Sequence, residues 1–322
     1  MAFASNTGFA LARADMTQPK LIIGSRGSPL ALAQARMVAA ALEEAHGWNR
    51  SSVEIVAVKT SGDRIQDRPL AEVGGKALWT KELDIALLAG DTHCSVHSMK
   101  DVESKRPDTL LVAAMLPRAD VRDRLIGAAS VAELPPGALV GTSSPRRAAQ
   151  LKRLRPDLEL VPIRGNVDTR LAKCAGGEVD ATLLAAAGLI RLRRDDVGVA
   201  IELDEMLPAP SQAAIGIECR ANDAETAALL KAIDHAETHQ AVLAERSFCL
   251  ALGGTCHSPV AALARVEGRE IAFSCEILSE DGSEHLIEHA RFPAGDLDSP
   301  ATLARRMLAE APPSIRRLFE GE

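Results

Sequence analysis

Short apolar runs alternate with longer apolar-rich stretches along the first two thirds of the chain. The short runs predict buried strands at Leu21–Ile23, Val53–Val58, Leu110–Met115, Leu158–Ile163 and Ala181–Ala187. The longer stretches between them, such as 78–88, predict helices. This alternation is typical of a mostly parallel α/β sheet.

One arrangement of residues occurs twice. Gly24–Pro29 follows the first apolar run, and Gly141–Pro145 follows a second one; in both, Ser-Pro precedes a helix that carries a glutamine five residues after the proline (Gln34 and Gln150). Serine is a good helix cap, proline suits the first helical position, and the free N–H groups of such a turn attract anions. The repeat predicts two related α/β lobes, whose turns either bind an anion or simply begin two helices.

The pattern changes after Arg220. A helix is expected around Ala241–Leu252, followed by the loop GGTCHSP, strands at Ile271–Leu278 and His285–Phe292, and a terminal helix. These elements predict a third, smaller α+β domain.

Composition agrees with a globular protein of several domains. The chain has 322 residues, of which 47% are hydrophobic and 25% charged, and such a length corresponds to two or three domains of about 100–150 residues. The formal charge of -7 and the absence of tyrosine argue against a nucleic-acid-binding protein. Nucleic acid is therefore only a minor hypothesis for the partner of this protein.

Cysteine usage and the first residues indicate a cytoplasmic protein. The six cysteines form no CxxC pair and no disulfide framework. Residues 1–18 contain only short apolar stretches interrupted by Arg13 and Asp15, too little for a secretory signal or a membrane span. We expect a flexible N-terminal tail and no membrane association.

Basic residues are concentrated after the second Ser-Pro turn. Between Thr142 and Lys173 there are eight basic and three acidic residues. Arg146 and Arg147 lie just inside a helix N-terminus, where cations are unfavourable, so a bound anion explains their position better than helix stability does. The expected anion ligands are Arg26, Arg146, Arg147, Arg164 and Arg170, whereas Lys152, Arg153 and Arg155 are expected to be solvated.

Asp101 is the candidate catalytic carboxylate. It follows His97-Ser98-Met99-Lys100 at the end of a short predicted strand, and strand ends in α/β lobes face the ligand crevice. A surface ion pair with Lys100 or a helix cap is the competing interpretation.

The polar segment 61–76 before the next helix is either a lid over a cleft or an ordinary surface loop.

Cys256 is the most approachable thiol, because it lies in a Gly-rich loop and not in an apolar run. A metal site is not expected, since a strand would place Cys94 on the face opposite His93 and His97. The chain contains neither a P-loop nor a GxSxG elbow.

Together these motifs resemble the porphobilinogen deaminase (hydroxymethylbilane synthase) family from about Lys20 to the C-terminal region. They occur in the order and spacing of the family: GSRGSPLALAQA, GGKALWTKELD, VHSMKD, GTSSPRRAAQL, IRGNVDTRL, AAAGLIRL, LPAPSQAAIGIECR and the GGTCHSP loop. The resemblance implies two α/β lobes similar to those of periplasmic binding proteins, plus a smaller C-terminal α+β domain. The corresponding ranges are 19–116 with 215–232, 120–208, and 236–322.

The resemblance also implies an activity. Four porphobilinogen molecules would be condensed head to tail, with loss of ammonia, on a dipyrromethane cofactor bound through a thioether to Cys256, and the tetrapyrrole hydroxymethylbilane would be released for haem biosynthesis. Asp101, assisted by Lys100, would bind pyrrole N–H groups, help expel ammonia, stabilise the cationic azafulvene-like intermediate and remove a proton after bond formation. The family is usually monomeric.

Each pyrrole unit carries an acetate and a propionate, which accounts for the many basic residues. By motif, the cofactor would be bound by Ser98, Lys100, Asp101, Ser143, Ser144, Arg146, Arg147, Arg164, Arg170 and Cys256. The substrate would be bound by Arg26, Ser28, Gln34, Lys76, Lys81, Arg164, Arg170, Arg191 and Gln212.

Several positions depart from the family pattern. Thr255 precedes Cys256, Glu103 follows KDV, and Asp168 lies beside the basic residues, where it would lower anion affinity or cap a helix.

Two other functions fit parts of the sequence. One is a non-catalytic two-lobed protein that binds an anionic ligand, and the other is a transferase or hydrolase that uses Cys256 with His257.

Overall fold

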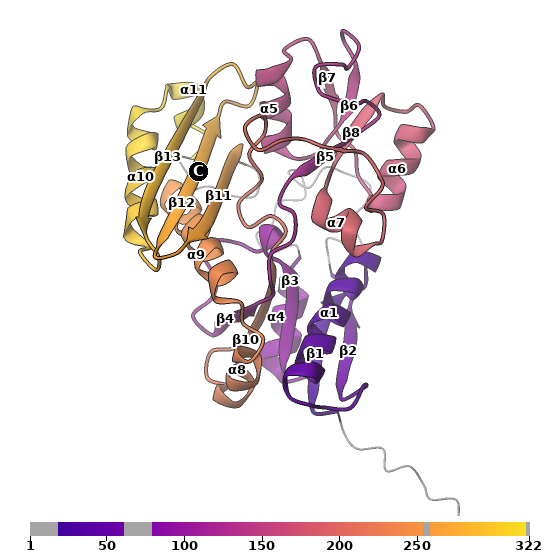
Figure 1. The fold of residues 1–322 in the computed structure, drawn as a ribbon, viewed down its shortest axis with the longest axis vertical. Helices are drawn as coiled ribbons and strands as arrows, with labels where there is room; N and C mark the ends of the chain where they lie inside the picture. Colours follow the sequence, from indigo (N-terminus) through magenta and orange to yellow (C-terminus); the bar gives the residue numbers. More distant parts are fainter. Residues whose placement is uncertain (1–18, 61–78, 254–257, 320–322) are drawn as a thin grey trace, which may run out of the picture.

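The computed structural model describes residues 19–60, 79–253 and 258–319. This part of the chain forms two five-stranded sheets and one three-stranded sheet, each with helices packed against it (Figure 1). We refer to the three parts as the first lobe, the second lobe and the C-terminal domain. The expected α/β lobes and smaller α+β domain are confirmed.

The first lobe is built on the sheet β2-β1-β3-β10-β4. Its strands are β1 (Leu21–Arg26), β2 (Val53–Val58), β3 (Cys94–Ser98), β4 (Leu110–Met115) and β10 (Ile215–Arg220). Its helices are α1 (Pro29–Ala45), α4 (Lys81–Ala89) and α8 (Ala224–Lys231). The strand β10 returns from beyond the second lobe and pairs with β3 and β4 in antiparallel fashion, whereas the other strands of the sheet run in one direction, so the sheet is mostly parallel as predicted.

The second lobe has the sheet β7-β6-β8-β5-β9. Its strands are β5 (Asp123–Ile126), β6 (Leu139–Gly141), β7 (Glu159–Val161), β8 (Ala181–Ala185) and β9 (Val199–Ala200). Its helices are α5 (Pro145–Leu154), α6 (Val167–Ala175) and α7 (Ala186–Arg191). β5 is antiparallel to both neighbours, and Ala186 and Ala187, expected in a strand, begin α7 instead.

Both Ser-Pro turns begin helices as predicted. Ser28 Oγ accepts a hydrogen bond from the Ala31 amide (3.3 Å), and Ser144 Oγ accepts one from the Arg147 amide (3.4 Å). A proline occupies the first turn of α1 and of α5, where its missing N–H costs nothing. The two helix starts therefore arise from the same local chemistry in the two lobes.

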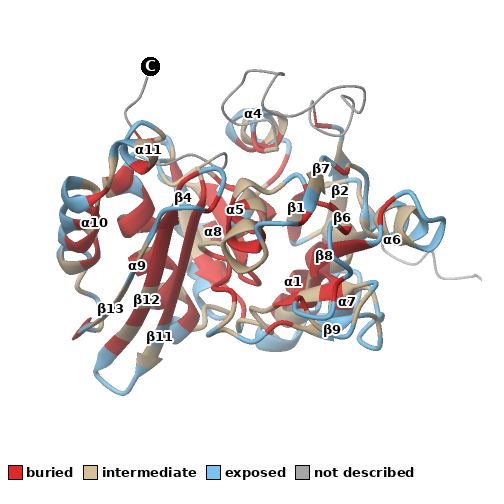
Figure 2. Ribbon diagram, turned by 90° about the horizontal axis from the view of Figure 1, so that it is seen from above, coloured by how far each residue is buried: buried red, intermediate tan, exposed pale blue. Residues whose placement is uncertain are grey.

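The C-terminal domain packs helices against an antiparallel sheet of order β11-β12-β13. Its elements are α9 (Ala236–Leu252), β11 (Val260–Glu267), β12 (Glu270–Leu278), β13 (His285–Pro293), α10 (Asp298–Glu310) and α11 (Pro313–Arg316). Phe248 of α9 packs with Phe273 of β12 at a centroid separation of 5.5 Å. Figure 2 shows β11 and β12 largely buried, whereas much of the outer side of α10 is exposed.

Buried carboxylates join the three parts. Glu245 of α9 is fully buried and accepts two hydrogen bonds from Arg118, which follows β4, at 2.7 and 3.0 Å. It also accepts from the backbone amides of Ser211 (2.5 Å) and Ala264 (2.7 Å). One side chain thus binds both lobe connections and the C-terminal sheet, because Arg118 lies in the connection that enters the second lobe and Ser211 in the one that leaves it.

A second contact joins α5 to the C-terminal domain. Glu276 of β12 accepts a hydrogen bond from Gln150 (2.6 Å) and forms an ion pair with Arg153 (3.0 Å). A Cβ atom at Gly282, in the β12–β13 turn, would lie 2.2 Å from the carbonyl oxygen of Ala149. The turn therefore approaches α5 as closely as a residue without a side chain allows.

The predicted solvation of three cations after the second Ser-Pro turn is correct only for Lys152, which donates at the surface to the Pro156 carbonyl. Arg153 is used in the contact with Glu276. Arg155 binds Asp157 through two hydrogen bonds of 2.7 Å and donates to the carbonyls of Val131, Ala132, Leu134 and Pro135. Both arginines therefore have structural roles, because their guanidiniums bind carboxylates and backbone carbonyls of other segments. The pattern of residues along the helix does not show these partners.

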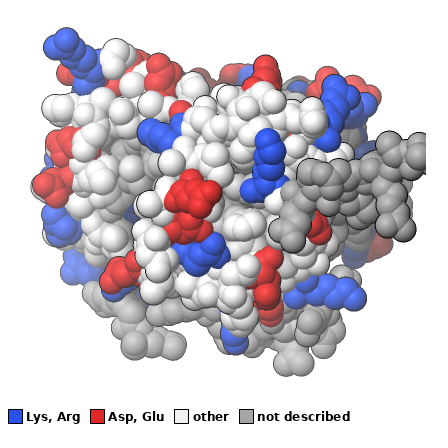
Figure 3. Space-filling view, turned by 90° about the horizontal axis from the view of Figure 1, so that it is seen from below, with Lys and Arg blue, Asp and Glu red and all other residues white. Residues whose placement is uncertain are grey.

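On the face seen in Figure 3, the basic and acidic side chains of the described residues are interspersed. No helix within these residues is both long and apolar enough to cross a membrane.

Candidate active site

Asp101 lies at the end of a single 3-10 turn, η1 (Met99–Asp101), that directly follows β3. Met99 is buried, and its amide donates to the carbonyl of Ala214 (3.1 Å). A Cβ atom at Gly216 of β10 would lie 2.1 Å from the Met99 sulfur. The absence of a side chain at Gly216 therefore lets Met99 anchor the turn that presents Lys100 and Asp101.

Cations from the second lobe lie close to this turn. The charges that act on Lys100 are those of Asp101, Arg147, Asp123 and Arg146, in decreasing order. Arg170 of α6 interacts electrostatically with Arg147, Asp101 and Arg164. Electrostatic interactions thus connect Lys100 of the first lobe with Arg146 and Arg147 of the second, and Arg170 with Asp101 and Arg164.

Arg26, the fifth arginine predicted from sequence, lies on the first-lobe side of the same region. A small cavity of about 60 Å³ is lined by Arg26, Gln34, Ser98 and Asp101, among others. The Arg26 guanidinium lies 3.8 Å from the ring centroid of Trp79, and Gln34 exchanges hydrogen bonds with Ser98 (2.8 and 3.1 Å). Strand ends β1 and β3 therefore place polar side chains beside Asp101.

Arg146 and Arg147 are buried, and both bind Asp123 at the start of β5, at 2.7 Å each. Burial acts to raise the pKa of Asp123, but the two guanidiniums hold it below its usual range. The carboxylate explains how two cations are tolerated at the N-terminus of α5. Sequence reasoning inferred a bound ligand anion there and missed that Asp123 of the protein itself pairs with both arginines.

Three cations of the site have lowered pKa values. Lys100 is accessible to solvent, yet it lies in crowded surroundings whose desolvation, with the arginines nearby, lowers its pKa to about 8. Desolvation also lowers the pKa of Arg170 and of Arg191 to about 10 each. Crowded, desolvated cations are stabilised by a bound anion, so these residues suit a ligand that carries several carboxylates.

Of the other residues predicted to bind cofactor or substrate, several donate hydrogen bonds to the protein itself. Ser143 Oγ donates to the Ile163 carbonyl (2.8 Å), and Arg191 donates to the Ala213 carbonyl (2.5 Å). Gln212 is buried and donates to Asp123 (2.9 Å), behind the arginine pair. Lys81 is exposed in the first turn of α4.

Asp168 does not pair with the predicted anion ligands. Its carboxylate binds Arg194 at 2.7 Å, and the cap of α6 is Asn166, whose side chain accepts from the Thr169 amide. The alternative that Asp168 caps the helix is therefore wrong, and the alternative that it lowers anion affinity stays a prediction.

A buried ionic cluster below the Lys100–Asp101 turn was missed. Glu218 of β10 is fully buried and accepts from Arg106 (2.8 and 3.0 Å), and His97 Nε2 lies 3.1 Å from its carboxylate. Burial opposes ionisation, but His97 and Arg106 lower the Glu218 pKa to about 2. The available signal was a glutamate within the apolar run IGIEC.

His93 and His97 are used in structural contacts, since His93 Nδ1 accepts from the Ile22 amide (2.8 Å). Within the described residues, no group of three or more metal-ligating side chains is assembled. Lys76, Thr255, Cys256 and the segment 61–76 lie outside those residues, as does the N-terminal range 1–18.

Several known proteins are similar to this chain. Its residues 21–228 match the family model "Porphobilinogen deaminase, dipyromethane cofactor binding domain", and residues 239–310 match "Porphobilinogen deaminase, C-terminal domain". A porphobilinogen deaminase of Sphingopyxis alaskensis is 59% identical over 93% of this chain and 96% of its own. One of Paracoccus denitrificans is 48% identical over 92% of this chain and 96% of its own.

Solved structures match part of the chain. A nutrient binding protein of Burkholderia cenocepacia bound to methionine is 14% identical, with a TM-score of 0.41, and the match covers 71% of this chain and 95% of that one. The family models together extend over both lobes and most of the C-terminal domain, and the relatives over nearly the whole length. The chain belongs to the porphobilinogen deaminase family.

Proposed function

We propose that this protein condenses four molecules of porphobilinogen into hydroxymethylbilane on a dipyrromethane cofactor bound to Cys256, with Asp101 as the catalytic carboxylate. The observation that carries the proposal is the position of Asp101 at the end of β3, among Lys100 of its own lobe and Arg170 of the other. A carboxylate at a lobe boundary lined with cations is suited to a substrate that has carboxylates at its edge and a pyrrole N–H at its centre.

The cation set fits the cofactor and the growing chain. Each added pyrrole brings two carboxylates, and desolvation lowers the pKa values of Lys100, Arg170 and Arg191, so a bound anion would stabilise their charged forms. Arginine forks bind carboxylates in bidentate fashion. When bound, dipyrromethane supplies the terminal pyrrole carbon to which the first porphobilinogen is joined.

Asp101 has three tasks in this proposal. Its carboxylate accepts a hydrogen bond from the pyrrole N–H of porphobilinogen and so orients the ring. It stabilises the positive charge that develops on that ring while the amino group leaves as ammonia. After the carbon–carbon bond has formed, it accepts the proton lost from the ring carbon. One carboxylate serves each addition, because the reacting position is the same in every cycle.

The other residues bind carboxylates or hold the site in place. We assign cofactor binding to Ser98, Lys100, Ser143, Ser144, Arg146, Arg147, Arg164 and Arg170. We assign substrate binding to Arg26, Ser28, Gln34, Lys76, Lys81, Arg164, Arg170, Arg191 and Gln212, with Lys100 assisting. The contacts of Ser143, Ser144 and Gln212 support a positioning role for these three, since each binds the protein itself.

The covalent cofactor can be tested by the intact mass of the purified protein. We expect a mass excess equal to two linked pyrrole units, and we expect Cys256→Ser to lack it because no thioether can form. Cys174→Ser, which changes a partly exposed cysteine of α6, serves as the control and should keep the excess. A fully active protein of unmodified mass would contradict the assignment.

Lys100 should make substrate binding dependent on pH. Its pKa is about 8, so the ammonium is charged below that value and neutral above it. The KM for porphobilinogen is therefore expected to rise as the pH increases from 7 to 9. In Lys100→Arg the cation persists throughout this range, and the rise should disappear. Parallel pH profiles of the two proteins would show that Lys100 does not bind substrate.

Three finer points belong to the same proposal. The protein acts as a monomer in the cytoplasm, without nucleic acid or membrane partners. Its domains comprise 19–116 with 215–232, 120–208, and 236–322. Each domain has its own sheet, which supports this division.

A further inference from the structure

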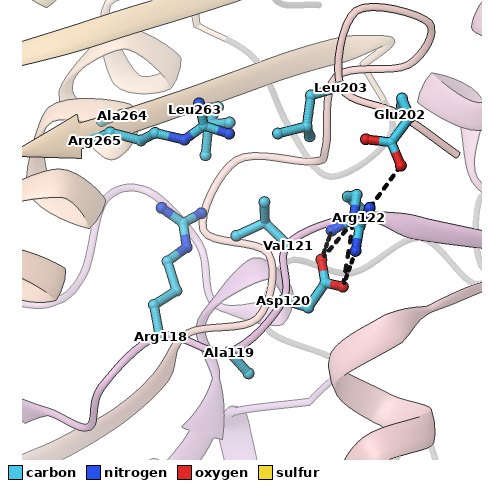
Figure 4. A pocket seen from close by; sticks show the side chains of 10 residues that line it. All are labelled: Arg118, Ala119, Asp120, Val121, Arg122, Glu202, Leu203, Leu263, Ala264 and Arg265. Carbon is cyan, nitrogen blue, oxygen red and sulfur yellow. Dashed lines mark hydrogen bonds and ion pairs between the residues drawn. The ribbon is translucent and has the colours of Figure 1, made fainter. Parts of the chain in front are cut away.

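A cavity of about 450 Å³ lies away from Asp101, where the two connections between the lobes meet the C-terminal sheet (Figure 4). Its walls come from residues 118–122, which lead from β4 into β5, from Glu202 and Leu203, which follow β9, and from 263–265 of β11. None of these residues lines the small cavity beside Asp101. The two sites are therefore distinct.

The arginines of this cavity differ in how their charge is balanced. Arg122 binds Asp120 through its Nε and a terminal nitrogen, and Glu202 at 2.6 Å. Arg118 is held by Glu245, behind the cavity. Arg265 is exposed, and no hydrogen bond or ion pair connects its guanidinium to another residue in the described part of the chain. Arg265 thus provides a cation without an internal counter-charge.

Figure 4 shows how these side chains lie. The guanidiniums of Arg118 and Arg265 approach the same end of the cavity from two different segments. Val121 and Leu203 extend between that end and the Arg122–Glu202 pair. Arg118 is already paired with Glu245, so an anion at this end of the cavity would chiefly balance the charge of Arg265.

We infer that this cavity binds a small organic carboxylate with an apolar body. The carboxylate is held by the fork of Arg265 with Arg118 beside it, and the apolar body lies on Val121, Leu203 and Leu263. The volume is within the range of about 300–1,000 Å³ that is usual for small-molecule sites. The mixed wall favours a carboxylate with a hydrocarbon or aromatic part over an inorganic anion, which would leave the apolar side chains uncovered.

The test uses 4-fluorophenylacetate as the probe and the holoenzyme as the protein. Fluorine NMR should detect saturable binding in the millimolar range, and the neutral probe 4-fluorophenylacetamide should not bind. Arg265→Gln should weaken binding about tenfold, because a charge-assisted hydrogen bond is lost. Arg265 is exposed, so the variant is expected to fold, and its melting temperature checks this.

Arg305→Gln changes an exposed arginine of α10 and serves as the matched control, with binding unchanged. Asp101→Asn, which changes the other site, should bind the probe as the unaltered protein does, because the two cavities share no lining residue. Weaker binding to Asp101→Asn, equal binding to Arg265→Gln, or equal binding of the amide would each overturn the inference. Turnover of porphobilinogen by Arg265→Gln without the probe should be normal, which separates this test from that of the proposed function.

Discussion

Asp101→Asn is expected to lower the turnover of porphobilinogen by about 10²–10⁴-fold, the usual contribution of a general acid–base group. Asparagine has nearly the same shape, so Met99 can still anchor the turn. The variant loses the negative charge that stabilises the developing cation and the group that accepts a proton. The rate of porphobilinogen consumption is the measurement, with intact mass and melting temperature measured on the same samples.

Asp108→Asn is the matched control. It removes an exposed carboxylate seven residues after Asp101, in the same connection between β3 and β4. Its turnover should equal that of the wild type. If Asp101→Asn kept the mass excess and also turned over porphobilinogen normally, Asp101 would not be the catalytic carboxylate. Loss of the mass excess together with turnover would instead indicate a failure in cofactor assembly.

Glu245→Ala is expected to have the largest effect on stability. It removes a fully buried carboxylate and leaves Arg118 and the amides of Ser211 and Ala264 without their acceptor. Breaking a buried pair in this way costs about 3–5 kcal/mol. Calorimetry should show a lower melting temperature, and the unfolding of the C-terminal domain should separate from that of the lobes.

Glu237→Ala, at an exposed position in the first turn of the same helix, provides the comparison. Surface substitutions of this kind usually change stability by no more than about 0.5 kcal/mol. Equal melting temperatures for the two alanine variants would show that the Glu245 contacts do not join the three parts of the molecule.

Local chemistry was sufficient to predict most helices and strands. Ser28-Pro29 and Ser144-Pro145 mark helix starts through capping and a fixed φ angle, and both depend only on adjacent residues. The position of β10 between β3 and β4 depends on pairing with strands that lie about a hundred residues earlier. The apolar pattern of IGIECR alone does not give the order or direction of that pairing, and the family resemblance implied only that this segment returns to the first lobe.

In the candidate site, too, residues that depend on local chemistry could be predicted, whereas residues that depend on distant parts of the chain could not. Arg146 and Arg147 were recognisable because a cation at a helix N-terminus is locally unfavourable. Asp123 could not be recognised, since it lies more than twenty residues earlier among other charges and becomes important only once β5 is placed beside α5. Arg153 was misinterpreted for the same reason: its partner Glu276 belongs to another domain.

The interior place of β10 in the first-lobe sheet, between β3 and β4, also fixes an order of events during synthesis. The second-lobe strands β5 to β9 all precede β10, so that lobe is complete while β3 and β4 still lack their shared neighbour. Until residue 220 has left the ribosome, both strands present open edges that can pair with other chains. A nascent chain that stalls after the second lobe should therefore aggregate through its first lobe, even though every residue of β1 to β4 has been made.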